Sequence, residues 1–319
     1  MPKMTLEFEK PIADLAAKIE ELKKFSSESN VDMSEEIALL EGKLEKQKRE
    51  VAKNLTPWQK VQLARHPERP YFEDYVERIA EDYLDLHGDR RYKDDGAIRG
   101  GFAKIDGRKV MLIGTQKGRN LEENKACNFG SPYPEGYRKA LRLMQMAELA
   151  GVPVVTLVDT PGAYPGIESE ERHIGEAIAV NLREMFKLTV PILVNVIGEG
   201  GSGGALGIGC GNKVNILENA YYSVITPEGC AAILWKDGAK TPDAAAALKL
   251  TCNDLKELGI IDDVISEPVG GAHLDYDKAA ELLKASIVKN LDELAKMSAE
   301  KLMEQRYDRF RVLGRFMEK

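Results

Sequence analysis

Eight glycines lie within fourteen consecutive residues of this chain, in the segment GEGGSGGALGIGCG at residues 198–211. The segment directly follows the apolar run VPILVNVI at residues 190–197, which is typical of a strand buried on both faces. Glycine costs the interior of a helix or strand about 0.5–1 kcal/mol relative to alanine. The density of glycine therefore indicates that bare backbone is needed here, either for close packing or for chemistry.

A strand that ends in glycines and turns into a helix points several backbone N–H groups in one direction, and the helix dipole reinforces them. Two such donors form an oxyanion hole, in which each donor contributes roughly 2.7–4 kcal/mol in acyl chemistry. A flat substrate can approach this backbone closely because glycine has no Cβ atom. This interpretation predicts chemistry on an enolate or a ureido anion.

The same glycines also fit the dinucleotide-binding fingerprint, because Gly198, Gly200 and Gly203 have its G-x-G-x-x-G spacing and follow a strand. A helix with further glycines from Gly207 onward would last only about two turns. The motif also needs an acidic residue at the end of the next strand, where Glu218 is a poor match. A dehydrogenase is therefore the weakest interpretation.

The segment 200–204 also matches G-x-S-x-G, the nucleophile elbow of serine hydrolases. Asp262 or Asp263 and then His273 follow Ser202 in the order that a catalytic triad of this kind needs. The competing interpretation is that Ser202 caps a helix and that His273 is a polar loop residue. A serine hydrolase that uses Ser202 is the alternative function.

At 319 residues and 43% hydrophobic content, the chain is long enough to fold as one large domain with an appendage, or as two domains. A formal net charge of −7 argues against broad nucleic-acid binding. The four cysteines form no C-x-x-C pair, so we expect no metal site and reduced thiols. The chain shows no apolar signal-peptide core and no run of membrane-spanning length. We therefore expect a cytoplasmic protein with no membrane or nucleic-acid partner.

Hydrophobic periodicity predicts the elements that position the glycine run. An N-terminal helical hairpin is expected over residues 10–52, with a polar break at SSESN. The main part should then contain strands at 97–105 and 109–116 joined by an Asp-Gly turn, a helix at 135–150, two short strands and a helix within 213–235, a helix at 242–258, a strand within 262–268 and a charged helical tail from 275.

A repeat lies at the centre of this pattern. The apolar runs at residues 152–158 and 190–196 align at an offset of 38 residues, and each ends in a glycine-containing loop, DTPGAYPG or GEGGSGG, that leads into a helix. This order predicts right-handed crossovers and a mostly parallel sheet. Ligands bind beyond the carboxyl ends of parallel strands, so both loops should meet at one site.

Four segments of the chain, GEGGSGGA, VDTPGAYPG, NFGSPYPEGYRKALRLMQMAE and VITPEGCAAILWKD, resemble the alpha-subunit family of bacterial acetyl-coenzyme A carboxylase carboxyltransferase. The resemblance runs from FEKPIADLAAKI near the N-terminus to about residue 310. It implies an α/β protein of the crotonase-like (ClpP/crotonase) fold, a ββα superhelix with an N-terminal helical hairpin. The implied domains are the hairpin at 1–54, the carboxyltransferase domain at 55–296 and a C-terminal helical tail at 297–319.

The resemblance also implies a function and its partners. The alpha subunit pairs with a beta subunit in an alpha2beta2 heterotetramer, and zinc is expected only in the beta subunit. Biotin arrives as carboxybiotin on the biotin carboxyl carrier protein, after biotin carboxylase has used ATP elsewhere in the complex. Transfer of the carboxyl group to acetyl-CoA then gives malonyl-CoA, the first committed step of fatty acid synthesis.

Carried over from the family, the oxyanion donors are the backbone N–H groups of Gly203 and Gly204, which would hold the biotin ureido oxygen. Substrate-binding residues are expected among Gly200 and Gly201 in the same run, Gly162 and Ala163 in the other glycine loop, and Arg138 and Lys139. On this basis Gly204→Val should abolish transfer without lowering the melting temperature.

Two further features lie near these loops. The family commonly has Gly-Gln after EER, whereas this chain has His173-Ile174, and His173 is interpreted as an exposed residue at a helix start. The basic residues of the first crossover segment either are solvated charges or form a positive surface for coenzyme A phosphates or for an acidic carrier protein. They are Lys117, Arg119, Arg138, Lys139 and Arg142.

Overall fold

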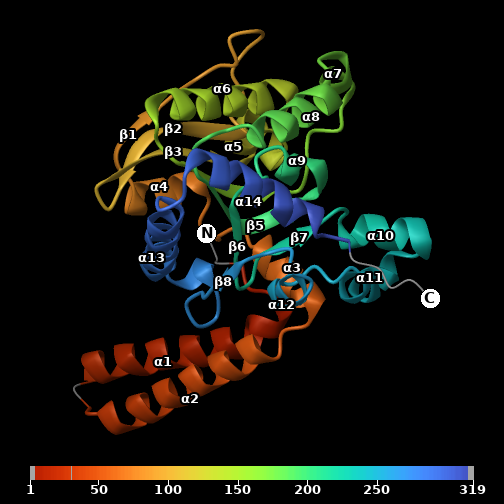
Figure 1. Ribbon diagram of the computed structural model, residues 1–319. Coiled ribbons are helices and arrows are strands. Elements are labelled where there is room, and N and C mark those ends of the chain that lie inside the picture. Colours follow the sequence, from red (N-terminus) through yellow and green to blue (C-terminus); the bar gives the residue numbers. More distant parts are fainter. Residues whose placement is uncertain (1–3, 30, 315–319) are drawn as a thin grey trace.

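The computed structural model describes residues 4–29 and 31–314, and Figure 1 shows their arrangement around one eight-stranded sheet. The first three strands form an antiparallel meander, and all other pairs are parallel. In spatial order the strands are β1 (Glu81–Asp85), β2 (Ile98–Ile105), β3 (Arg108–Thr115), β4 (Val154–Thr160), β5 (Ile192–Gly201), β6 (Lys213–Leu217) and β8 (Asp263–Ile265), with β7 (Tyr221–Ser223) paired to the end of β5.

The predicted hairpin between β2 and β3 is confirmed. Ile105 pairs with Arg108, which leaves a two-residue loop of Asp106 and Gly107. Both loop residues have positive φ, 50° and 73°, as a type I′ turn requires.

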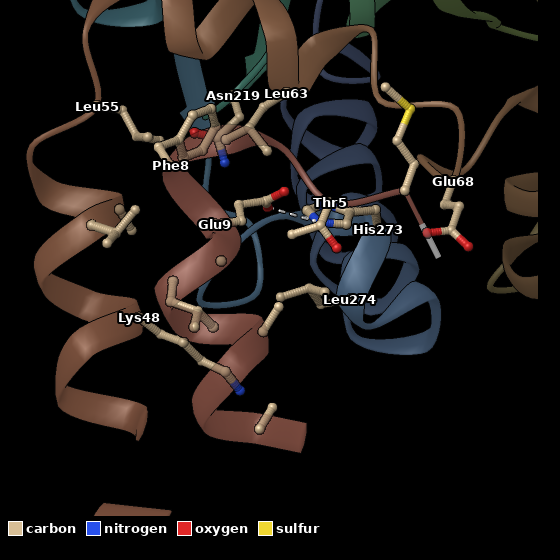
Figure 2. A pocket seen from close by; sticks show the side chains of 17 residues that line it. Thr5, Phe8, Glu9, Lys48, Leu55, Leu63, Glu68, Asn219, His273 and Leu274 are labelled. Atoms are coloured by element: carbon tan, nitrogen blue, oxygen red, sulfur yellow. Dashed lines mark ion pairs between the residues drawn. The ribbon is translucent and has the colours of Figure 1, made fainter. Parts of the chain in front are cut away.

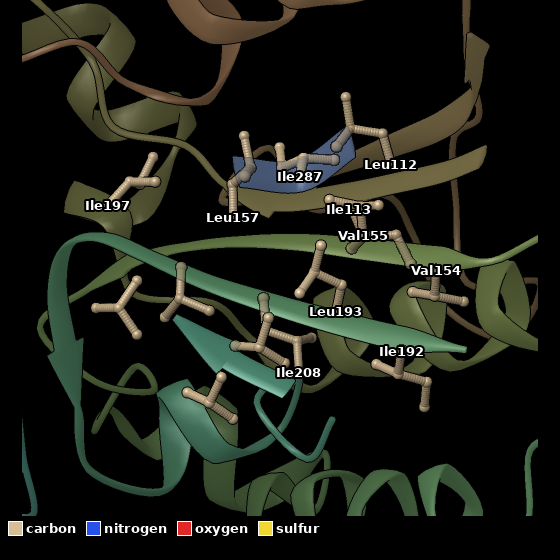
Figure 3. Close-up of a cluster of buried hydrophobic side chains, with 14 of the residues drawn as sticks. Leu112, Ile113, Val154, Val155, Leu157, Ile192, Leu193, Ile197, Ile208 and Ile287 are labelled. Atoms are coloured by element: carbon tan, nitrogen blue, oxygen red, sulfur yellow. The ribbon is translucent and has the colours of Figure 1, made fainter. Parts of the chain in front are cut away.

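The repeat at an offset of 38 residues is confirmed, because its two copies form the neighbouring strands β4 and β5 and pair at this same offset. Val154 pairs with Ile192 and Val158 with Val196 in parallel, and every residue of β4 and β5 is buried. Strands covered on both faces have continuous apolar sequences because neither face meets water. Figure 3 shows their side chains packed together with Ile287 and Ile208 in the main core.

Helices cover both faces of the sheet and form the appendage. They are α1 (Lys10–Ser29), α2 (Ser34–Lys53), α3 (Pro57–Ala64), α4 (Phe72–Ile79), α5 (Leu121–Ala126), α6 (Pro134–Ala150), α7 (Ile167–Glu171), α8 (Ile174–Met185), α9 (Ser202–Leu206), α10 (Pro227–Leu234), α11 (Thr241–Ala247), α12 (Cys252–Glu257), α13 (Tyr276–Leu294) and α14 (Ala299–Arg311), with short 3-10 turns at Glu7–Glu9, Asn128–Gly130, Gly238–Lys240 and Ala272–Leu274. The helix predicted at 135–150 is confirmed as α6, and Gly151 ends it with φ 66°.

The single helix expected at 242–258 is wrong, because the chain forms two helices, α11 and α12, in this region. Between them Thr251 forms an antiparallel bridge with Tyr221 of β7. The Thr251 side chain also accepts a hydrogen bond from the N–H of Asp254 and so caps α12. The long-range bridge takes the backbone out of the helical conformation.

The C-terminal helix α14 packs against the start of β5 through one buried cation. Arg306 is fully buried and donates to the carbonyl oxygens of Leu188 and Val190 at 2.9 and 3.0 Å, and to Oδ1 of Asn212 at 2.8 Å. Leu302 on the same helix is also buried. This part of the chain, predicted as a charged tail, therefore forms part of the packed body.

The hairpin of α1 and α2 projects from the body (Figure 1) and is attached at its base by a small polar cluster. Glu9 Oε1 lies 3.1 Å from Nε2 of His273, and Nε2 of His66 lies 3.1 Å from the carbonyl oxygen of Met4. The His66 and His273 rings stack with their centroids 4.2 Å apart. Figure 2 shows Glu9 and His273 in a largely apolar cavity of about 410 Å³ between the hairpin and the body.

These contacts predict that hairpin docking weakens as the pH falls. Burial and the neighbouring His273 lower the pKa of His66, so the folded chain binds this proton less readily than the unfolded chain does. Burial alone would raise the pKa of Glu9, but hydrogen bonds from His273 and the N–H of Leu6 lower it below its ordinary value. Both shifts reduce stability on acidification, beginning below the ordinary histidine pKa of about 6.5.

We therefore expect amide hydrogen exchange in α1, corrected for its intrinsic pH dependence, to rise relative to α6 between about pH 7.5 and 5.5. His66→Gln keeps a donor for the Met4 carbonyl and removes the titrating group, so it should flatten this dependence. Equal behaviour of α1 and α6 across the range would show that the cluster does not control docking.

Candidate functional site

The two glycine loops meet where β4 and β5 end, as the parallel repeat predicts. A Cβ atom added to Gly204 would lie 2.4 Å from the backbone nitrogen of Ala163 and 2.6 Å from the carbonyl carbon of Gly162. One added to Gly201 would lie 2.2 Å from the carbonyl oxygen of Pro161. The structure therefore brings together Gly162, Ala163, Gly201 and Gly204 as neighbouring backbone.

Close packing accounts for most of the glycine run. For seven of its eight glycines, an added Cβ atom would come within 3.0 Å of another atom of the fold. Gly198 packs against the Asp159 carboxylate, Gly200 against the Tyr222 ring and Gly207 against the Tyr137 ring. The exception is Gly203, whose nearest such neighbour is the end of the Ile178 side chain at 3.9 Å.

This difference corrects the expectation for Gly204→Val. The expectation was that a side chain at Gly204 would meet only substrate, and it is wrong because Gly204 is buried against the backbone of the other loop. Gly203 is partly exposed and has open space in front of its Cα atom. A side chain at Gly203, and not at Gly204, would extend into accessible space.

Backbone donors are available at this point. Ser202 has φ 53°, in the left-handed region, and α9 begins there. Within residues 4–29 and 31–314, the N–H groups of Gly203 and Gly204 donate to no backbone or side-chain acceptor. The Gly204 carbonyl accepts a hydrogen bond of 3.0 Å from the Tyr137 hydroxyl, which fixes the orientation of this peptide segment.

An apolar cavity of about 300 Å³ opens beside Gly203. It is lined by residues of α9, β7, α12 and the end of α14, among them Leu206, Tyr222, Leu255, Ile260 and Phe310. Such a cavity can hold a flat apolar ring system while the backbone N–H groups hold a polar atom at its edge.

A buried ionic network lies beneath the glycine run. Lys117 Nζ donates to Asp159 Oδ1 at 2.6 Å and to Glu199 Oε1 at 2.9 Å. Glu199 Oε2 accepts from Arg65 Nε at 2.8 Å and from the Tyr221 hydroxyl at 2.6 Å. The network therefore joins the end of β4, where Asp159 lies, to the end of β5, where Glu199 lies.

Electrostatics keep the network charged. Burial alone would raise the pKa of Glu199, but the charges of Lys117 and Arg65 lower it to about 2. Burial alone would lower the pKa of Lys117, but Asp159 and Glu199 hold it well above its ordinary range. Lys117 and Arg65 are already paired with carboxylates, so their role is to hold the ends of β4 and β5 in place.

Of the two alternatives for the basic segment, solvated charges or a positive surface, neither describes the cations that the fold itself pairs with carboxylates. Lys117 is held within the network, and Arg119 pairs with Asp74. Lys139 is fully buried, with Nζ 2.5 Å from Asp94 Oδ1, so its assignment to substrate binding is wrong.

Arg138 is also engaged by the fold. Its Nε atom donates to the buried carboxylate of Asp89 at 2.8 Å, so it holds structure and is not free for substrate. Of the five basic residues, only Arg142 forms no ion pair with a described carboxylate, and it donates to the carbonyl oxygens of His87 and Gly88.

Asp159 and Glu199 are site residues that the sequence interpretation missed, although both lie in the quoted glycine loops. A signal was present, because each carboxylate lies at the end of an apolar run of the kind expected for a strand buried on both faces. A charge at such a position must find a partner inside the fold.

The serine hydrolase alternative is not supported. In the described residues the Ser202 hydroxyl makes no hydrogen bond to a histidine or carboxylate. His273 instead contacts Glu9 and His66 at the base of the hairpin, and Asp262 accepts from the N–H of Val214. The dinucleotide interpretation fails as well, because the five residues of α9 are too short for that motif.

Glu9, His66 and His273 are also close enough to suggest metal ligands, with their ligating atoms within 4.8 Å of one another. However, Nδ1 of His66 accepts the N–H of Glu68, and its Nε2 faces the Met4 carbonyl oxygen. Both ring nitrogens of His66 are therefore already engaged by groups of the chain. The cluster is therefore better explained as the hairpin attachment.

His173 is exposed and begins α8, as expected, with φ 64°.

Across residues 4–29 and 31–314, every helix is too short or too polar to span a lipid bilayer.

The chain matches the family described as "Acetyl co-enzyme A carboxylase carboxyltransferase-like" over residues 5–314. It is 56% identical over 309 residues to the acetyl-coenzyme A carboxylase carboxyl transferase subunit alpha of Syntrophotalea carbinolica, covering 97% of each chain. It is 55% identical over 313 residues to the subunit of that name in Geobacter metallireducens, covering 98% of each.

Solved structures share the fold at lower identity. A Pseudomonas malonate decarboxylase hetero-dimer aligns with a TM-score of 0.59 at 15% identity, covering 75% of this chain and 95% of that chain. Transcarboxylase 12S, solved with methylmalonyl-coenzyme A and methylmalonic acid bound, aligns with a TM-score of 0.58 at 22% identity. That alignment covers 71% of this chain and 42% of that chain, so this chain spans less than half of it. These neighbours confirm the α/β crotonase fold.

The packing of the glycine run predicts opposite effects of alanine at adjacent positions. Gly204→Ala should lower the free energy of unfolding by about 1–3 kcal/mol, because the new Cβ atom meets the backbone of Gly162 and Ala163. Gly203→Ala should change it by less than about 0.5 kcal/mol, since the site is open. Urea denaturation of both variants measures the difference, and equal destabilisation would contradict the described packing.

The ionic network predicts a large cost for removing one charge. Glu199→Gln should lower the free energy of unfolding by about 3–5 kcal/mol, because Lys117 and Arg65 lose a buried partner. Glu228 pairs with the same Arg65 but is half exposed, so Glu228→Gln should cost no more than about 1 kcal/mol. Chemical denaturation of the two variants provides the test, and a similar cost for both would mean that burial does not govern the network.

Proposed function

The chain belongs to the acetyl-coenzyme A carboxylase carboxyltransferase family as an alpha subunit, and from this premise we propose how its glycine run takes part in carboxyl transfer. The backbone N–H groups of Gly203 and Gly204 hold the ureido oxygen of biotin, which arrives as carboxybiotin on a separate carrier protein. The product is malonyl-CoA, formed from acetyl-CoA for fatty acid synthesis.

The observation that carries this proposal is the open position of Gly203. It is the one glycine of the run without close packing, its N–H group has no acceptor among the described residues, and it borders an apolar cavity of about 300 Å³. A fused bicyclic ring with one polar edge fits this combination of apolar walls and backbone donors.

The chemistry explains why donors are needed and a catalytic side chain is not. Loss of the carboxyl group from carboxybiotin develops negative charge on the ureido oxygen. Donors placed there bind the transition state more tightly than the ground state and so lower the barrier. The segment that carries these donors is held by the hydrogen bond from Tyr137 to the Gly204 carbonyl and by the close contact of Gly204 with Ala163.

The remaining predicted site residues have supporting roles in this proposal. Gly162, Ala163, Gly200 and Gly201 allow the two loops to approach each other, and they position the donors. Their contribution is geometric, since they contact one another's backbone or the Tyr222 ring.

An alpha subunit implies a beta subunit, and the proposal gives the partner the complementary tasks. In an alpha2beta2 assembly the beta subunit would carry the zinc site and hold acetyl-CoA. The biotin carboxyl carrier protein would deliver carboxybiotin made by biotin carboxylase. This division agrees with a transferase site in this chain that consists of backbone donors.

The test is reconstitution of this chain with its beta subunit, carboxybiotin and acetyl-CoA, with malonyl-CoA as the measured product. We expect the complex to form malonyl-CoA and the isolated chain to form none. Gly203→Val should reduce transfer by about 100-fold or more while melting close to the wild-type temperature, because the side chain fills the mouth of the cavity.

Ser202→Ala is the matched control at the adjacent residue. It keeps every backbone donor, so transfer should fall by less than about tenfold, whereas loss of a nucleophilic serine typically costs about 10⁶-fold. Normal transfer by Gly203→Val, or a loss of nucleophile size in Ser202→Ala, would overturn the proposed role of the glycine run.

A further inference from the structure

A polar cavity of about 480 Å³ lies between α6, α8 and the loop at residues 89–91, apart from the glycine site. Figure 1 shows α6 and α8 side by side above the sheet. Five arginines line the cavity, together with three acidic residues and the amides of Gln145 and Asn181. The arginines are Arg90, Arg91, Arg138, Arg142 and Arg183, and the acidic residues are Asp89, Glu176 and Glu184.

The charges in this cavity do not balance. Asp89 is occupied by Arg138 at 2.8 Å, and Glu184 is occupied by Arg183 at 2.7 Å. Among the residues that the structure describes, Arg90, Arg91 and Arg142 form no ion pair with any carboxylate. Glu176 is then the single lining carboxylate left to offset three guanidinium groups. This surplus is unexpected in a protein with a net charge of −7.

Two of these cations are held close together. Arg90 Nη1 and Arg142 Nη2 donate to the same carbonyl oxygen, that of His87, at 2.7 and 3.1 Å. Arg142 Nε donates to the carbonyl oxygen of Gly88 at 3.1 Å. Burial lowers the pKa of Arg142 and the charge of Arg90 lowers it further, while the nearby charges of Asp94 and Asp89 offset part of this shift. Asp94 and Asp89 form their ion pairs with Lys139 and Arg138, so the backbone holds two like charges side by side without a carboxylate paired to either.

The loop that carries Arg90 is built to keep this arrangement. Arg90 has φ 64°, in the left-handed region that favours glycine, and Gly88 has φ 76°. The Asp89 carboxylate accepts the N–H groups of Arg91 and Tyr92 at 2.9 and 2.8 Å and also binds Arg138 of α6. The loop is therefore fixed to α6 with its unpaired arginines toward the cavity.

We propose that this arginine-lined cavity binds a small multivalent anion that carries phosphate groups. The planar guanidinium group presents paired donors that match two phosphate oxygens, and each donor not used by the backbone is available for this purpose. Three cations against one free carboxylate favour an anion with more than one negative charge. The cavity volume accommodates a small molecule of this class and not a folded partner.

Binding of inorganic pyrophosphate to the full-length chain, alone and in complex with the beta subunit, tests the proposal. Isothermal titration calorimetry at constant ionic strength should give saturable binding, and chloride at equal ionic strength should give none. Arg90→Gln and Arg91→Gln should each weaken binding by about tenfold. Arg183→Gln is the matched control, because Arg183 lies in the same cavity but is paired with Glu184, and its effect should stay below about threefold.

Three outcomes would overturn the proposal. One is the absence of saturable pyrophosphate binding, and another is undiminished binding by the folded Arg90→Gln, Arg91→Gln double variant. The third is loss of binding when the beta subunit is added, which would show that partner carboxylates fill the cavity. Citrate forms a further arm of the titration, and tighter binding of citrate than of pyrophosphate would contradict the phosphate assignment. Arg91 makes no side-chain hydrogen bond within the described chain, so the Arg91→Gln variant should fold even if substitution of Arg90 disturbs the loop.

Discussion

The contact of Lys117 with Asp159 and Glu199 is the constraint on which the site depends. It joins the carboxyl ends of β4 and β5 inside the protein, where an uncompensated charge would be far more costly than on the surface. Asp159 also accepts the N–H of Glu199 at 2.8 Å, so the same carboxylate fixes backbone and cation together. The loops that follow the two strands therefore begin from fixed positions.

The glycine run follows from that constraint. With the strand ends held together, the two loops approach until the Cα atom of Gly204 faces the backbone of Gly162 and Ala163, and a side chain has no space there. At Gly198 a side chain has no space either, because the Asp159 carboxylate lies against its Cα atom. What close packing leaves unexplained is Gly203 alone. The ionic network thus accounts for the packing of the loops. This packing explains every glycine of the run except Gly203, whose role must be a different one.

Local and periodic features of the fold could be predicted from the sequence. The repeat at an offset of 38 residues predicts the pairing of Val154 with Ile192, which the structure shows. The predicted Asp106-Gly107 turn is likewise found as a two-residue hairpin loop. Partners of long charged side chains could not be predicted in this way. Lys139 pairs with Asp94, 45 residues earlier in the chain, and nothing in the local sequence distinguishes it from a solvated lysine. The break between α11 and α12 likewise depends on a bridge to β7 that only the tertiary fold supplies.

Pairing with carboxylates separates structural cations from cations that can serve a ligand. Lys117 and Lys139 belong to the same basic segment as Arg142, yet both are neutralised by acidic groups of the fold. Arg142 bonds only to uncharged groups and shares a carbonyl oxygen with a second arginine. A protein of net negative charge has enough carboxylates to neutralise such a pair. Because the fold instead holds these guanidinium groups together without an ion pair to either within the described chain, their unused N–H donors are available to a ligand, whereas those of Lys117 are not.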